Sequence, residues 1–125
     1  MKKPERIPSH SYEIDGELVE LVLDMRAKTI ATKLAIEYDV SQNDPMMMVI
    51  ISFVAMVNSA AIRSGSTSDM LTVDDILEAD FDITKLSTIV KDVKDAAYKM
   101  EYKKDDGDLY ADEVADNENP PKGVS

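Results

Sequence analysis

The stretch DPMMMVIISFVAMVNSAAIR, residues 44–63, decides the fold of this chain. Asp44 followed by Pro45 is typical of a helix start, because the acid caps the first turn and proline fits the first helical position. Among the twelve residues after the proline only Ser52 is polar, so a helix over Pro45–Arg63 is apolar on nearly every side. One small domain seldom surrounds such a helix completely, and we therefore expect a homo-oligomer.

The same helix is also the segment to test as a membrane span. Met46–Ile62 has only the minimum length for crossing the hydrocarbon core of a bilayer, and a run of this length is more often a buried core helix. Its flanks, Asp44 and Arg63, provide no basic cluster that would set an orientation. We expect a core helix and no membrane span.

Before this helix, residues 12–19 read YEIDGELV and predict a β-hairpin. Asp15-Gly16 is the strongest short turn signal, because both turn positions take positive φ. A two-residue turn pairs Ile14 with Glu17, Glu13 with Leu18 and Tyr12 with Val19. The apolar strand continues to Leu23, and Asp24 is expected to cap a first helix over Met25–Tyr38.

After the central helix, two further helices are predicted. Thr72-Val73-Asp74-Asp75 resembles a capping box and starts a short helix that reaches Ala79. Asp82 or Thr84 then caps a fourth helix, whose apolar stripe is formed by Leu86, Ile89, Val90, Val93, Ala97 and Met100.

The C-terminal end is acidic and lacks an apolar period from Lys103 onward. Residues 105–125 carry seven acids and one lysine, too little apolar area to offset the entropy of an ordered chain. The sequence therefore predicts an α+β fold, predominantly α: an N-terminal β-hairpin followed by about four helices and a disordered acidic C-terminal tail. The expected parts are an N-terminal arm at 1–10, a folded domain at 11–102 and the tail at 103–125.

Length and composition exclude several functional classes. The 125 residues correspond to one domain, and the net charge of −11 argues against direct nucleic-acid binding, which needs a basic surface. Cys is absent and His occurs once, so the chain has little material for thiolate or histidine metal sites and for histidine catalysis. We expect no catalytic residue, no metal and no cofactor.

One short motif nevertheless resembles an active-site sequence. Asp80-Phe81-Asp82-Ile83-Thr84 matches the nucleophile motif of aspartate-dependent phosphatases letter for letter. That chemistry needs the acids at the end of a buried parallel strand, and here the motif lies between two predicted helices. We interpret it as a helix-capping turn.

The methionine-rich part of the central helix is the candidate binding site. Met is flexible and polarisable, and it is over-used on surfaces that accept varied apolar partners. Ordinary core filling is the first interpretation of such residues, and an adaptable contact surface is the second. If they form a contact surface, the partner-binding residues are Met46, Met47, Met48, Val49, Ile50, Phe53 and Met56.

The layout of the chain resembles the tail assembly chaperones of long-tailed, siphovirus-type bacteriophages. Two segments carry the resemblance: the opening Tyr12-Glu13-Ile14-Asp15-Gly16 with its strand to Leu23, and Leu71–Leu77 with Phe81-Asp82-Ile83 before an amphipathic helix. Members of this family have no catalytic residues. They hold the apolar tape measure protein in the host cytoplasm until tail-tube subunits polymerise around it, and they are not expected in the mature virion.

The resemblance also implies a second product in many members of the family. Ribosomal frameshifting adds a C-terminal extension that contacts the tail-tube protein, and here it would fall near Pro120–Ser125. Two other interpretations stay open. The acidity suggests a phage-encoded inhibitor or DNA mimic that blocks a host protein, and the apolar run at Met46–Ile62 suggests a small membrane-associated phage protein.

Overall fold

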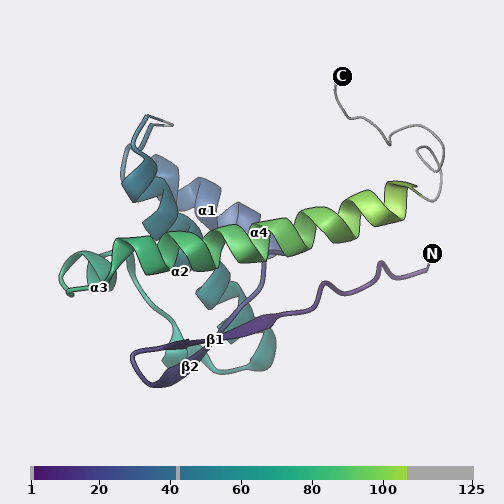
Figure 1. The fold of residues 1–125 in the computed structure, drawn as a ribbon, viewed down its shortest axis with the longest axis horizontal. Helices are drawn as coiled ribbons and strands as arrows, with labels where there is room; N and C mark the ends of the chain where they lie inside the picture. Colours follow the sequence, from purple (N-terminus) through teal and green to yellow (C-terminus); the bar gives the residue numbers. More distant parts are fainter. Residues whose placement is uncertain (1, 42, 107–125) are drawn as a thin grey trace. The chain divides into compact units, whose positions relative to one another are not determined.

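The computed structural model describes residues 2–41 and 43–106 of the chain. Figure 1 shows a two-stranded hairpin followed by helices, as the sequence predicts. The chain divides into two units, one up to Lys94 and one from Asp95, and the first holds every element before α4 and the beginning of α4. The elements are β1 (His10–Ile14), β2 (Glu17–Leu21), α1 (Met25–Glu37), α2 (Pro45–Ser64), the 3₁₀ turn η1 (Thr67–Asp69), α3 (Val73–Leu77) and α4 (Ile83–Asp106).

The hairpin has the predicted turn and register. Asp15 and Gly16 take φ of 51° and 83°, which is the left-handed geometry of a type I′ turn. The strands pair Ile14 with Glu17, Glu13 with Leu18 and Tyr12 with Val19, and the pairing continues to His10 and Leu21. The side chains of Ile14 and Leu21 lie on the buried face of this sheet, whereas Leu18 lies on the other face and is exposed.

Helix α1 is capped by Asp24, as predicted, and lies antiparallel to α2. The Asp24 carboxylate accepts hydrogen bonds from the Ala27 amide at 2.9 Å and from the buried Ser59 hydroxyl at 2.6 Å. The start of α1 is therefore tied to the C-terminal half of α2. Because only a short connection joins the two helices, the end of α1 lies near the start of α2.

Helix α2 is the centre of the core. Asp44 accepts from the Met47 amide at 3.2 Å, and Gly65 ends the helix with a φ of 78°. By length and composition α2 could cross a membrane, but its residues 50–61 are all buried inside the fold. A single chain therefore covers residues 50–61 of this helix, and the homo-oligomer expected from its apolar surface stays a prediction.

The segments after α2 carry the predicted caps. Thr72 and Asp75 form a complete capping box at α3. The Asp82 carboxylate accepts from the Thr84 amide at 3.0 Å, so the phosphatase-like motif is a helix-capping turn. Helix α4 adds Leu86, Ile89, Val90 and Val93 to the same core as the hairpin and α2.

The boundary of the C-terminal tail differs from the expected one. Helix α4 continues to Asp106, four residues beyond the expected end of the folded domain at 102. Lysine has a high helix propensity, and residues 103 and 104 are both lysines, so the sequence there favours helix without an apolar stripe. The rest of the predicted disordered tail, residues 107–125, lies outside the described residues.

Candidate functional site

Three of the seven predicted contact residues lie in the core. Ile50, Phe53 and Met56 are almost completely buried and belong to the same cluster as Leu21 and Leu86. They are not accessible to a partner in this fold, so the prediction of one continuous contact surface over all seven residues needs correction. The physical reason is that the hairpin, α1 and α4 together cover this part of α2.

The other four residues form the first turn of α2. Met46 is 56% exposed, and Met47, Met48 and Val49 are half-buried. Met47 and Val49 pack against the core, which leaves Met46 and Met48 as the side chains most available for contact. We call this segment, Met46–Val49, the α2 first turn.

A second exposed apolar residue lies at the same end of the helix pair. Ile36, in the last turn of α1, is 75% exposed. Because α1 and α2 are antiparallel, the last turn of α1 and the α2 first turn lie at one end of the pair. Exposed apolar side chains that gather on a small domain are typical of an interaction surface.

Tyr38 links this end of the helix pair to α3. Partial burial raises the pKa of its phenol, and the carboxylates of Asp74 and Glu37 raise this pKa further; the Tyr38 hydroxyl also hydrogen-bonds Asp74. In the hairpin, burial and then the charge of Asp92 raise the pKa of Tyr12. Both phenols therefore stay protonated at neutral pH.

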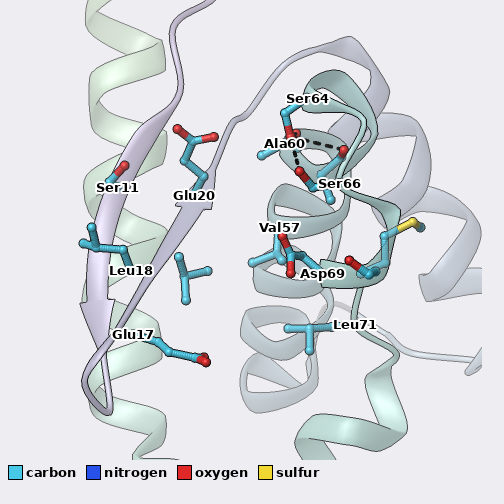
Figure 2. A pocket seen from close by; sticks show the side chains of 14 residues that line it. Ser11, Glu17, Leu18, Glu20, Val57, Ala60, Ser64, Ser66, Asp69 and Leu71 are labelled. Carbon is cyan, nitrogen blue, oxygen red and sulfur yellow. Dashed lines mark hydrogen bonds between the residues drawn. The ribbon is translucent and has the colours of Figure 1, made fainter.

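The structure also contains a groove that the sequence did not indicate. It has a volume of about 620 Å³ and lies between β2, the C-terminal half of α2 and the segment that follows α2. Figure 2 shows Glu17 and Glu20 on the β2 side and Val57, Ala60 and Leu71 on the α2 side. We call it the β2 groove.

The wall of the β2 groove is fixed by a side chain from α2. Asn58 is buried, its amide donates to the Leu71 carbonyl at 2.8 Å, and its carbonyl accepts from the Leu71 amide at 2.7 Å. Asn58 thus satisfies both backbone groups of Leu71, as a neighbouring strand would. This pair of bonds holds the segment that carries Asp69 and Met70 against α2.

Among the described residues, no group of three His, Asp or Glu side chains is placed to hold a metal ion. In the phosphatase-like motif, the Asp82 carboxylate caps the start of α4. The arrangement can bind apolar or extended partners through the α2 first turn or the β2 groove.

Sequence reasoning missed the β2 groove because its parts come from segments far apart in the chain. One signal was available: residues 10–21 contain four acids and no lysine or arginine, which is unusual for an exposed strand edge. Compared with known proteins, the chain matches no family model, no curated protein and no solved structure.

Proposed function

We propose that this protein is a non-enzymatic tail assembly chaperone of long-tailed bacteriophages, which binds the apolar tape measure protein and keeps it soluble until the tail tube forms. The observation that carries the proposal is the α2 first turn, where Met46 is exposed and Met48 is half-buried, at the start of a helix whose twelve residues from Ile50 are buried. The layout of the hairpin and helices supports the same family.

The α2 first turn suits a client with varied apolar stripes. Methionine side chains have three rotatable bonds and adapt to partners of different shape. An amphipathic helix can lay its apolar face on such a surface, with anchors spaced at three or four residues. Binding of this kind needs no chemical step, which fits a chaperone that must release its client when tail-tube subunits arrive.

The charge of the chain supports a role in solubility. Residues 105–125 hold −6 of the net charge of −11. A strongly charged complex repels its copies, and this repulsion opposes aggregation of an apolar client. The proposed site of action is the host cytoplasm, before the virion is complete, with the tail-tube protein as a second partner of any frameshifted product.

A co-expression pull-down with the tape measure protein tests the proposal. The double variant Met46→Ser/Met48→Ser removes the two methionines of the α2 first turn that are most available for contact, and it should recover much less client than wild type. Met25→Ser is the matched control, because Met25 is 74% exposed and lies at the opposite end of α1. Equal recovery with both variants would place the contact elsewhere.

A truncation tests the solubility part of the proposal. Removing residues 107–125 leaves α4 complete. We expect an unchanged melting temperature and a lower solubility of the complex with the tape measure protein. If the truncated complex stays as soluble as the complete one, the acidic residues have another role.

A further inference from the structure

The β2 groove exposes the unpaired edge of a β-strand. The two-residue turn closes on the pair Ile14–Glu17, so backbone groups of Glu17, Val19 and Leu21 face β1. Those of Leu18 and Glu20, which alternate with them, face the other way. The Val22 amide, the next in this alternation, faces the same way as those of Leu18 and Glu20 and donates a hydrogen bond to the Met56 carbonyl of α2 at 3.2 Å.

The hydrogen-bonding groups of this edge are not used within the described part of the chain. Apart from the β1–β2 pairing, no hydrogen bond among the described residues involves the backbone N–H or C=O of Leu18 or Glu20. Figure 2 shows that the β2 groove lies beside this edge, with Glu20 and Glu17 on one side and Ala60 and Val57 on the other. An extended peptide placed there meets free N–H and C=O groups on β2 and apolar side chains from α2.

The charge of the edge selects against a second copy of the same strand. Glu17 and Glu20 line the β2 groove on one side and Asp69 on the other, and the lining contains no lysine or arginine. Within the described residues none of these three carboxylates has an ion-pair partner. Two copies of β2 placed edge to edge would bring like charges together, which costs free energy. A basic segment would instead gain from the same charges.

We propose that the β2 groove binds an extended segment of another protein, in which apolar and basic residues alternate, and that this segment adds a third strand to the edge of β2. Main-chain hydrogen bonds to Leu18 and Glu20 give the segment its extended form. Its apolar side chains lie against Val57, Ala60 and Leu71, and its basic side chains face the carboxylates. This surface is separate from the α2 first turn, and the proposal does not depend on the chaperone function.

The basic N-terminal arm of a second copy is the other occupant to consider. It contains Lys2, Lys3 and Arg6, but Pro4 and Pro8 leave only three consecutive residues with an amide donor. The carbonyl of one of these, Ile7, already accepts a hydrogen bond from Arg63. Arg6 and Arg63 also line a smaller hollow that adjoins the β2 groove at Glu20, where the arm of the same chain lies. We therefore assign the groove to a different protein.

A fluorescent six-residue peptide of alternating lysine and valine is the probe for this groove. Anisotropy titration of the full chain should give saturable binding that weakens with salt, and the matching peptide of alternating glutamate and valine should not bind. Glu17→Lys/Glu20→Lys should weaken binding by about tenfold or more, because each attraction between a carboxylate of the groove and a lysine of the peptide is replaced by repulsion between two lysines. Glu13→Lys is the control, since Glu13 is an exposed acid of β1 outside the groove.

Two comparisons test strand addition itself. Glu20→Pro removes an N–H that faces the groove and leaves the ladder with β1 intact, so it should weaken binding more than Glu20→Gln, which removes only the charge. Two further peptides carry N-methyl groups on alternate residues, one peptide on the odd positions and the other on the even positions. Only the peptide whose methylated amides would face β2 should lose binding. An equal effect of both patterns, or unchanged binding to Glu17→Lys/Glu20→Lys, would overturn the proposal. A dimer in sedimentation velocity that is lost on removal of residues 2–9 would assign the groove to a second copy.

Discussion

Replacing Asn58 by alanine should destabilise the fold more than its small volume suggests. The substitution removes two hydrogen bonds, of 2.7 and 2.8 Å, and leaves both backbone groups of Leu71 without their partner. Each lost bond lowers the free energy of unfolding by about 1 kcal/mol, and the unpaired backbone groups of Leu71 add part of their desolvation cost, for a total of ~2–3 kcal/mol. For a domain of this size that corresponds to a fall in Tm of roughly 10–20 °C.

Thermal unfolding followed by circular dichroism measures this loss, and Ser52→Ala is the matched control. Ser52 is a second buried polar residue of α2, and its hydroxyl forms no hydrogen bond with a described residue. Alanine there removes an unsatisfied group and favours the helix, so the stability should stay within about 0.5 kcal/mol of wild type or rise. Similar melting temperatures for Asn58→Ala and wild type would refute the reasoning.

Hydrogen exchange separates the local effect from the global one. In wild type the Leu71 amide donates to Asn58 and should exchange slowly. In Asn58→Ala it should exchange much faster than amides in the middle of α2, because the segment beside the β2 groove is released before the core opens. Equal protection of the Leu71 amide in both proteins would mean that another group holds this segment.

Four other substitutions test the fold. Leu21→Asp places a charge at a completely buried position and should cost several kcal/mol in chemical denaturation, on the order of ~3–5 kcal/mol, whereas Leu18→Asp, at a position 79% exposed, should cost less than about 1 kcal/mol. Gly65→Ala meets no neighbouring atom within 4 Å but has to adopt a φ of 78°, so a loss of about 1 kcal/mol in the same assay would come from the backbone alone. The pKa of Tyr38 is raised in the folded state, so the contribution of its phenol to stability is complete below pH 10 and is lost as the pH rises through the raised pKa. The difference in ultraviolet titration between wild type and Tyr38→Phe should therefore have its midpoint above pH 10. A midpoint at or below pH 10 would contradict the contact with Asp74.

The local elements could be predicted because short-range chemistry specifies them. Asp15-Gly16 sets the hairpin register, and Asp24, Asp44 and Asp82 cap the helices that follow them. Each of these signals acts over two to four residues, so it can be read without knowledge of the tertiary structure.

The candidate site could be predicted only in part, because an evenly apolar helix has no preferred face. Nothing in the pattern of α2 shows that Met46 is exposed while Met56 is buried; that difference depends on which part of the helix the other elements cover. The Asn58–Leu71 pair and the Ser59–Asp24 hydrogen bond join residues 13 and 35 positions apart. Such contacts leave no periodicity in the sequence.

The core of α2 is completed only after α4 has been translated, and this affects folding on the ribosome. Helix α2 receives part of its cover from elements before it, but Leu86, Ile89, Val90 and Val93 come from α4, which is translated later. At about 5–20 residues per second, the roughly 30 residues from the end of α2 to Val93 take roughly 2–6 s. During that interval the nascent chain presents an apolar segment that resembles a membrane signal, so ribosome-associated targeting factors compete with folding for it.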